Sequence, residues 1–227
     1  TSNLTYHDNS ISYSENRYAG GLKTTAESVA ILNSNFSNLH ENSALHYELE
    51  NSGLIVIKEC IFDGLQGKYS SDGFKYSAFS IKSDNAIFQH NIIRKCELPI
   101  VGELYGRKAQ FYGIGKFECS KIELDYCEFS NNKCSYVNPS SSLCGGGSGI
   151  VFESSLRELT ISNSLFDSNK ANVSLTSDLE GEAKGGGFYF NYNSYLEIVN
   201  CTFKSNTADR EGGGIAIEKC TSCLINN

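Results

Sequence analysis

The chain has 227 residues, enough to bury the core of one sizeable domain. Its formal net charge of −7 excludes a general nucleic-acid binder, because such proteins present a basic face. No apolar run in the sequence approaches the roughly 20 residues that a membrane-spanning helix needs. We therefore expect one domain, with no nucleic-acid partner and no membrane span in this segment.

Taken in chain order, the sequence repeats one short unit that consists of an apolar strand, an inward anchor residue and a hydrophilic excursion. Residues 1–24, 29–47 and 54–82 each supply one unit, and a degenerate unit and three longer ones follow. The anchors are Tyr13, Phe36, Phe62, Ile93, Phe129, Phe166 and Phe203. Their spacing is 26 residues between Phe36 and Phe62 but 37 residues between successive members of the last three. The shared part stays constant while the excursion grows, which is typical of a solenoid.

The unit from 196 to 217 is the most complete one. Leu196 and Ile198 alternate along an extended strand, the inward parity changes at Cys201, and Phe203 continues the inward side. A third apolar run follows three glycines. A propeller blade would need about 40 to 50 residues and four strands, and no window has the apolar period of a helix. The sequence predicts an all-β, single-stranded, right-handed parallel β-helix with three short strands per coil, about six to seven coils, and long loops leaving one corner.

In four units an asparagine follows the anchor by three residues. These residues are Asn16, Asn132, Asn169 and Asn206. Stacked coils would place their amides one above another along the axis. We therefore expect an asparagine ladder with a structural role.

The unit carries aromatic-x-x-Asn at 13–16, 129–132, 166–169 and 203–206, and two glycines followed by an aliphatic residue at 20–22 and 213–215. This combination resembles the repeats of the chlamydial polymorphic outer membrane proteins and of related β-helical adhesin passengers. The middle coils depart from it and carry Leu39, Leu65 and Cys96 at the asparagine position. The resemblance implies a right-handed β-helix and a surface protein.

Nine cysteines indicate an oxidising compartment. Cys60, Cys127 and Cys201 occupy the same inward site, and the coils between them carry Asn91 or Ser164 there. Residues two rungs apart have Cα atoms about 9.6 Å apart, beyond the roughly 7 Å limit of a disulfide. We therefore expect these three cysteines to be small core residues that do not pair with one another.

Two other pairs of cysteines lie closer in the sequence. Cys134 and Cys144 bracket a Ser-rich loop, and a disulfide between them would hold its two ends together. Cys220 and Cys223 have the spacing of half a zinc knuckle or of a redox pair. No second pair has metal-ligand spacing and the four histidines are scattered, so we expect neither a metal nor a cofactor.

Four sequons of the form Asn-x-Ser/Thr begin at Asn3, Asn35, Asn172 and Asn200. A chain rich in Asn and Ser also produces such triplets by chance. Asn172 falls in a predicted loop and is the best candidate for N-glycosylation. Asn200 falls at a corner where we expect its side chain to turn inward, so it is a poor candidate. Asn35 is an intermediate candidate for N-glycosylation, and the case for Asn3 depends on what precedes it.

The enzymatic alternative is a polysaccharide-degrading β-helix, which would need two facing carboxylates. Glu123, Glu158 and Glu197 fit outward positions of neighbouring first strands. Lys121 and Arg157 lie close by, and a row of outward charges is usually a solvated face that discourages lateral sheet pairing. The sequence has no recognisable context for a catalytic nucleophile. It therefore favours a non-enzymatic protein.

We predict that residues 1–227 form one β-helix segment of a longer protein, because both ends of the sequence fall within repeats. The predicted role is structural or adhesive at the cell surface, in a coat, a filament or an adhesin stalk. The alternative is a carbohydrate-binding or polysaccharide-degrading β-helix. The expected partners are other protein chains or cell-surface glycans, with self-association through the β-helix ends. The expected location is extracellular, by secretion or by anchoring outside this segment.

Overall fold

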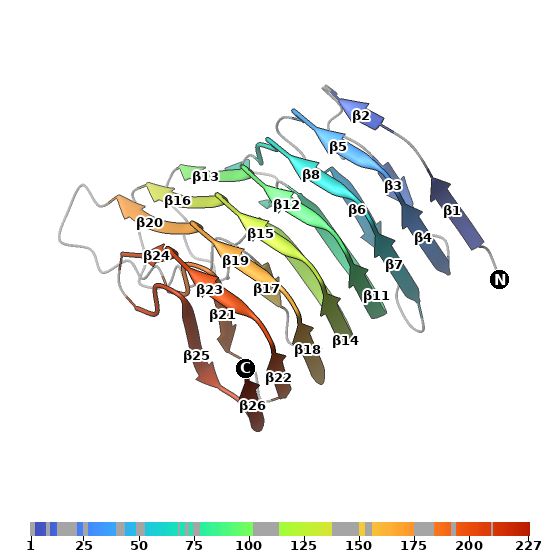
Figure 1. Cartoon of the computed structure of the whole chain (residues 1–227). Helices are drawn as coiled ribbons and strands as arrows, with labels where there is room; N and C mark the ends of the chain where they lie inside the picture. Colours follow the sequence, from blue (N-terminus) through green and yellow to red (C-terminus); the bar gives the residue numbers. More distant parts are fainter. Residues whose placement is uncertain are drawn as a thin grey trace.

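The computed structural model is a solenoid whose strands stack as successive parallel ribs from the N-terminal to the C-terminal end (Figure 1). It describes residues 3–7, 10–12, 22–24, 27–39, 44–48, 53–67, 69–70, 73–74, 78–101, 114–137, 150–152, 156–174, 184–191, 194–209 and 211–227. This described part is all-β and contains no helix, and hence no apolar helix long enough to cross a membrane. The predicted parallel β-helix is confirmed.

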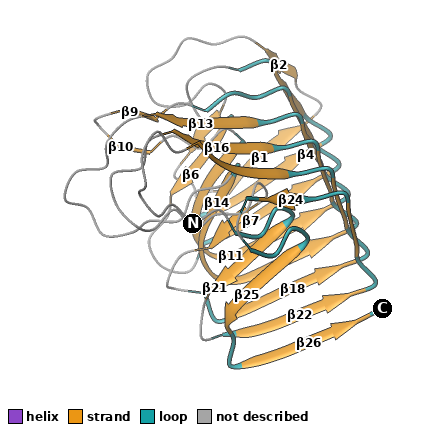
Figure 2. Cartoon of the chain, turned by 90° about the vertical axis from the view of Figure 1, so that its left-hand side faces the viewer, coloured by secondary structure: helices purple, strands orange, loops and turns teal. Residues whose placement is uncertain are grey.

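The first sheet contains a strand from every coil, paired in parallel and in sequence order. Its strands are β1 (Asn3–His7), β4 (Ser28–Leu32), β7 (Leu54–Lys58), β11 (Phe79–Gln89), β14 (Gly115–Asp125), β18 (Glu158–Ser162), β22 (Tyr195–Val199) and β26 (Ser222–Asn226). Figure 2 shows β18, β22 and β26 side by side at the C-terminal end. Alternation along each strand places apolar side chains inward, so the strands up to β22 bury one face.

The second sheet follows the first around each coil. Its three-residue strands are β2 (Ser10–Ser12), β5 (Asn35–Ser37), β8 (Ile61–Asp63), β12 (Ile92–Arg94), β15 (Glu128–Ser130), β19 (Leu165–Asp167) and β23 (Thr202–Lys204). A third sheet joins the later coils. Its strands are β13 (Glu97–Val101), β16 (Lys133–Val137), β20 (Lys170–Ser174) and β24 (Thr207–Ala208).

A closing strand completes each coil and leads into the next first-sheet strand. The separate closing strands are β3 (Leu22–Thr24), β6 (Leu45–Glu48), β17 (Ile150–Phe152), β21 (Phe188–Asn191) and β25 (Ile215–Lys219). In β11 and β14 the closing strand and the first-sheet strand are continuous, which explains their length of 11 residues. A small antiparallel hairpin, β9 (Tyr69–Ser70) and β10 (Gly73–Phe74), extends from one early coil.

The later coils contain four strands, because the third sheet adds one to the three that the sequence predicts. Residues 102–113, 138–149 and 175–183 each follow a third-sheet strand and precede a closing strand. These three segments lie outside the described residues. They all depart from the same position in the coil, so an increase in their length leaves the stacking of the rungs unchanged.

Left-handed backbone conformations turn the chain at two corners in each coil. The first corner uses Asn33, Glu59, His90, Tyr126, Asn163 and Asn200, with φ between 46° and 56°. The second corner uses Asn38, Gly64, Lys95, Asn131, Ser168 and Ser205, with φ between 53° and 65°. Non-glycine residues rarely adopt this region without support, so the neighbouring rungs hold these turns in place.

The anchor residues of the second sheet are in register. Phe129 pairs with Phe166 and Phe166 with Phe203. Their ring centroids are 4.9 and 4.7 Å apart, and the rings lie within 7° of parallel. Phe36 and Phe62 form a second stack, with a centroid separation of 5.0 Å, and Ile93 separates the two stacks.

The first anchor differs from the sequence prediction. Ile11 is the residue that pairs with Phe36, whereas Tyr13 lies outside the described residues. Tyr6, from the first sheet, stacks on Phe36 with a centroid separation of 6.2 Å. Ile11 and Tyr13 have the same parity along the chain, and the sequence analysis took the aromatic residue as the anchor.

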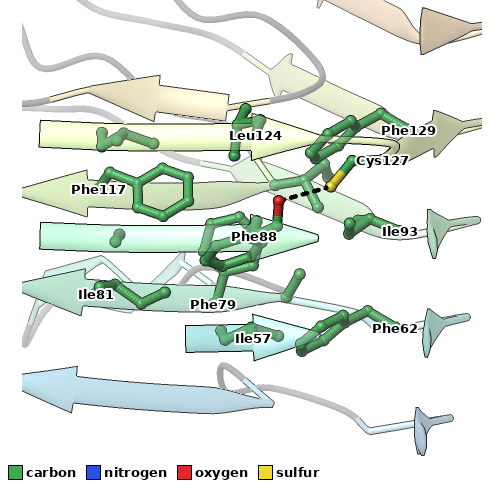
Figure 3. Close-up of a cluster of buried hydrophobic side chains, with 14 of the residues drawn as sticks. Ile57, Phe62, Phe79, Ile81, Phe88, Ile93, Phe117, Leu124, Cys127 and Phe129 are labelled. Carbon is green, nitrogen blue, oxygen red and sulfur yellow. Dashed lines mark hydrogen bonds between the residues drawn. The ribbon is translucent and has the colours of Figure 1, made fainter. Parts of the chain in front are cut away.

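The structure also contains a buried aromatic cluster that the sequence analysis missed. Phe79, Phe88 and Phe117 lie with ring centroids 4.9 to 5.1 Å apart (Figure 3). Phe79 comes from a closing strand and pairs in register with Gly115. A Cβ atom at Gly115 would lie only 2.2 Å from the Phe79 ring, so a larger residue here would require this ring to move.

The stacked anchors predict a large stability effect at Phe166, which is fully buried between Phe129 and Phe203. Phe166→Ala should lower the free energy of unfolding by about 3–5 kcal/mol, because it removes the ring contacts with Phe129, Phe203 and Phe188 and leaves a cavity. Chemical denaturation monitored by circular dichroism measures this change. Thr160→Ala, on the outward side of β18, is the control. Equal midpoints for the two variants would contradict the stacked core.

Candidate functional site: polar corners and the outer face of the first sheet

The asparagines at the second corner form a ladder of hydrogen bonds between rungs. Asn169 Oδ1 accepts a bond of 3.1 Å from the backbone N–H of Asn132, and Asn169 Nδ2 donates one of 2.8 Å to the carbonyl of Phe129. Asn206 repeats this pattern one rung on, with bonds to Asn169 N and Phe166 O. Asn132 and Asn169 are buried, so their role is structural. Asn16 lies outside the described residues.

Cys96 takes the asparagine position one rung before Asn132. Its backbone N–H donates to Asn132 Oδ1 at 3.0 Å, and its Sγ lies 3.7 Å from the carbonyl oxygen of Phe62. The thiol thus approaches the same carbonyl that an asparagine amide would reach. Leu39 and Leu65 fill this position in the earlier coils and are fully buried.

The first corner has an analogous inward column, made of Ser34, Cys60, Asn91, Cys127, Ser164 and Cys201. Asn91 Oδ1 accepts from Cys60 N at 2.9 Å, and Asn91 Nδ2 donates to Ile57 O at 2.8 Å. The thiols also point to the preceding rung: Cys127 Sγ lies 3.5 Å from Phe88 O, the bond drawn in Figure 3. Cys60, Cys127 and Cys201 are buried thiols outside any disulfide, and they act as weak donors at the corner as well as filling space.

Burial makes these thiols hard to ionise. It raises the pKa of Cys60 and Cys127 to about 11 and the pKa of Cys96 to about 12, from an ordinary value of 9.0. Cys119, which lies 3.4 Å from Ser83 Oγ on the paired strand, has its pKa raised by burial to about 11. A protonated, buried thiol is a poor nucleophile and a poor metal ligand.

The disulfide predicted between Cys134 and Cys144 stays a prediction. Cys134 lies on β16 and is fully buried, whereas Cys144 falls outside the described residues. Cys220 and Cys223 lie at the last corner, between β25 and β26. Among the described residues, no group of three or more metal-ligating side chains could hold a metal ion.

The four sequons differ in accessibility. Asn172 belongs to β20 and not to a loop, and its Oδ1 atom is buried without a hydrogen-bond partner among the described residues. Asn200 is exposed at the first corner, where its Nδ2 donates to Asn163 Oδ1 at 2.7 Å. The expected loop position of Asn172 and the expected inward direction of Asn200 were therefore wrong, whereas glycosylation at either residue stays a prediction. Asn35 is exposed on β5, and the side chain of Asn3 is outside the described set.

The outer face of the first sheet carries the three carboxylates of the enzymatic alternative. Glu123 and Glu197 share one column, with Thr160 between them in the register. Glu158 lies in the adjacent column, in register with Lys121. Lys121 Nζ lies 3.0 Å from Glu158 and 3.2 Å from Glu123, and these two carboxylates raise the pKa of the lysine.

A cavity of about 330 Å³ opens on this same face. Its lining combines the apolar side chains of Leu54 and Ile87 with Asn85, Lys121 and Glu123. Leu54, Asn85 and Lys121 lie on successive rungs of one column, so the cavity runs along the solenoid axis. The mixture of apolar and polar groups is typical of a contact site.

A charged network ties the last two coils together next to their glycine rows. Lys184 Nζ bonds to Glu218 Oε1, lies 3.4 Å from Glu211 Oε2, and is largely buried. Tyr189 donates to the second oxygen of Glu218 at 3.0 Å, and these partners hold the pKa of Glu218 below its usual value despite its partial desolvation. Sequence reasoning missed this network, because Lys184 and Glu218 are 34 residues apart and share no motif.

The fold and its ladders define the class of protein: a parallel β-helix whose coils are joined through polar corner side chains. Residues 200–218 match the family described as the Chlamydia polymorphic membrane protein repeat. This segment contains Phe203, Asn206 and the glycines 212–214, the motifs on which the resemblance in the sequence depends. Neither the curated proteins nor the solved structures gave a match.

The asparagine ladder predicts a specific sensitivity at Asn169. Asn169→Leu removes the partners of the Asn132 N–H and the Phe129 carbonyl inside the core, and it should lower the free energy of unfolding by about 2–4 kcal/mol. Urea denaturation measures the change. The matched control is Asn85→Leu on the outer face, which should stay within about 0.5 kcal/mol of the unchanged protein. A ladder without energetic importance would give equal values for both variants.

The thiols predict how stability depends on pH. The unfolded chain releases thiol protons near pH 9, whereas the folded chain retains them until higher pH, so the folded state binds more protons in that window. The free energy of unfolding should therefore fall as the pH rises from about 9 toward about 11.

Cys127→Ser isolates the contribution of one thiol, because serine already occupies this corner position at Ser34 and Ser164. The variant should show a decline that is shallower by up to about 1.4 kcal/mol per pH unit. Urea denaturation at a series of pH values compares the two slopes. Identical slopes would exclude a raised pKa at Cys127.

Proposed function

We propose that this chain is a non-enzymatic, extracellular β-helical segment with a structural or adhesive role on a cell surface. The observation that carries the proposal is the use of the inward polar side chains: Asn91, Asn132 and Asn169 bond to backbone groups of neighbouring rungs. These buried polar side chains thus serve as hydrogen-bond partners that join neighbouring coils. The match of residues 200–218 to a repeat of polymorphic membrane proteins supports a surface location.

Ion pairs between rungs support the structural side of the proposal. Arg94 lies 2.8 Å from Asp63, Lys133 lies 2.8 Å from Glu97, and Lys204 lies 3.1 Å from Asp167. Each pair joins adjacent coils on an outer surface. Exposed pairs contribute little stability individually, but alternating charges favour the correct register and keep outer surfaces from pairing with other sheets.

The cavity on the first sheet supports the adhesive side. Leu54 and Ile87 offer an apolar contact on a face that otherwise carries charge, and Asn85 and Lys121 lie at the same opening. A protein side chain or a sugar ring could place its apolar part there and its polar groups against these residues. The outer face of the first sheet is therefore the contact surface of the proposal.

Binding measurements test the adhesive role. The labelled protein should bind a glycan array or intact cells saturably, and Ile87→Glu should abolish binding because it fills the cavity with charge. Val199→Glu, on the same face but in the column of Asp125 and two rungs beyond Lys121 and Glu123, is the matched control. Saturable binding by a monomer supports adhesion. Filaments in electron micrographs without array binding support the structural role, and a monomer that binds nothing overturns both.

The carboxylates on the first sheet suggest one enzymatic alternative, a polysaccharide-degrading enzyme. Glu123 lines the cavity, and Lys121 lies 3.2 Å from Glu123 and 3.0 Å from Glu158 on the next rung, where a polysaccharide could run along the axis. Incubation with acidic and neutral polysaccharides, followed by measurement of reducing ends, tests this candidate. Cleavage that disappears in Glu123→Gln and Glu158→Gln would overturn the non-enzymatic proposal.

A further inference from the structure

Tyr126 is an exposed aromatic residue at the first corner of the solenoid. Its side chain belongs to a residue that is 55% exposed, compared with 36% for Tyr195, the other exposed aromatic residue of the described part. The Tyr195 hydroxyl donates to Glu197 at 3.2 Å, so Tyr195 has a local partner on its own strand. Tyr126 lies between β14 and β15, in the middle of the stack, with paired rungs on both sides.

The backbone of Tyr126 adopts a conformation that is unfavourable for a bulky side chain. Its φ is 49°, in the left-handed region where asparagine is tolerated and a large side chain is an outlier. Asn33, Asn163 and Asn200 make the same turn in other coils. The fold therefore does not require an aromatic residue here, and an outlier of this kind points to a function of the side chain.

His90 supports the Tyr126 ring from the preceding rung. The two ring centroids are 5.0 Å apart, and the rings lie within 8° of parallel. The backbone N–H groups of both residues donate to the next rung, His90 to the carbonyl of Asp125 at 3.0 Å and Tyr126 to that of Ser162 at 3.2 Å. Because His90 covers one face of the Tyr126 ring, the exposed area lies on the opposite face and around the ring edge.

Polar side chains next to Tyr126 are held in a fixed orientation. Asn163, the next residue of the corner column, donates from Nδ2 to Asp125 Oδ1 at 2.9 Å. Ser162 Oγ donates to the same carboxylate oxygen at 2.7 Å, and Asn163 Oδ1 accepts from Asn200 Nδ2 at 2.7 Å. The corner thus places an exposed aromatic ring beside an ordered carboxylate and an ordered amide.

We propose that Tyr126, Asn163 and Asp125 form a binding site for a neutral sugar ring of a glycan. One face of a pyranose carries C–H groups, which pack on the electron-rich face of a tyrosine. Its hydroxyl groups can donate to the Asp125 carboxylate and accept from the Asn163 amide. An aromatic side chain of a peptide would gain nothing from these polar groups, and an acidic sugar would be repelled by Asp125. The site therefore selects neutral sugars.

This site borders the outer face of the first sheet. Asp125 and Glu123 are alternate outward residues of β14, about 7 Å apart, and Glu123 lines the cavity. A longer glycan can therefore extend from Tyr126 to the cavity, whereas a disaccharide can occupy the Tyr126 site alone. The inference rests on the adhesive side of the proposed function and names a neutral glycan as its partner.

Saturation-transfer difference NMR on the purified protein tests the site. The neutral probes are lactose, maltose and N,N′-diacetylchitobiose, and the acidic probe is glucuronic acid. At least one neutral disaccharide should receive saturation at its C–H protons. Tyr126→Asn should weaken its binding by about tenfold, because this variant removes the ring and introduces the residue that makes the same turn at Asn33 and Asn163. Tyr126→Phe keeps the ring and should bind nearly as well as the unchanged protein.

Tyr195→Asn, at the other exposed aromatic residue, is the matched control and should bind the disaccharide unchanged. Circular dichroism verifies that each variant is folded. The inference is overturned if no neutral disaccharide binds up to its solubility limit, if glucuronic acid binds equally well, or if Tyr126→Asn binds like the unchanged protein. Saturable binding to cells that depends on Ile87 but not on Tyr126 would reject this site and retain the adhesive proposal.

Discussion

The hydrogen bonds that run from a corner of one coil to the next are the constraint on which this structure depends. At two corners of the coil a left-handed residue turns the chain, and backbone groups beside these corners face the buried interior. A buried N–H or carbonyl without a partner is strongly unfavourable. Asn132, Asn169 and Asn206 satisfy such groups on the preceding rung. These described coils therefore depend on the next coil to satisfy corner groups, so neighbouring coils stabilise one another.

This requirement explains the chemistry of the corner columns. Asn91, Cys127 and Ser164 occupy equivalent positions although they differ in size and polarity. Each of these side chains offers a donor hydrogen close to the backbone. Asn91 and Ser164 also accept a hydrogen bond from a backbone N–H of the preceding rung. Cysteine has the weakest donor of the three but tolerates burial best. The high cysteine content therefore reflects, in large part, corner packing and not a disulfide framework.

The sequence predicted the part of the structure that repeats. A spacing of 37 residues and the aromatic-x-x-Asn motif located Phe129, Phe166 and Phe203, which stack in the structure. It failed where the direction of a side chain depends on the backbone. Asn200 shares the parity of Leu196 and Ile198, yet its left-handed φ of 52° turns its side chain outward. Counting residues along an extended strand does not reveal such a reversal.

The prediction of the candidate site from the sequence was limited in a similar way. The glutamates of the outer face follow directly from alternation along a strand, so sequence reasoning found Glu123 and Glu197. It also found Glu158 as an outward residue, but it did not show that, in the register between coils, Glu158 lies in the column of Lys121, next to the column of Glu123 and Glu197. The cavity and the Lys184 network arise from this register and from the glycine rows, so neither has a signature within one unit.

The glycine rows explain how the excursions lengthen without disturbing the core. Gly186 packs directly against the coil that follows, where a Cβ atom would lie 2.4 Å from the carbonyl oxygens of Gly213 and Thr207. Gly185 and Gly212 have φ values of 63° and 61°, a backbone conformation that residues with a side chain rarely adopt. The chain thus returns onto the stack through a backbone approach that only glycine permits, whatever the length of the preceding segment. Because the return point and the corner ladder are both fixed by backbone geometry, a change in the length of an excursion has little cost to stability.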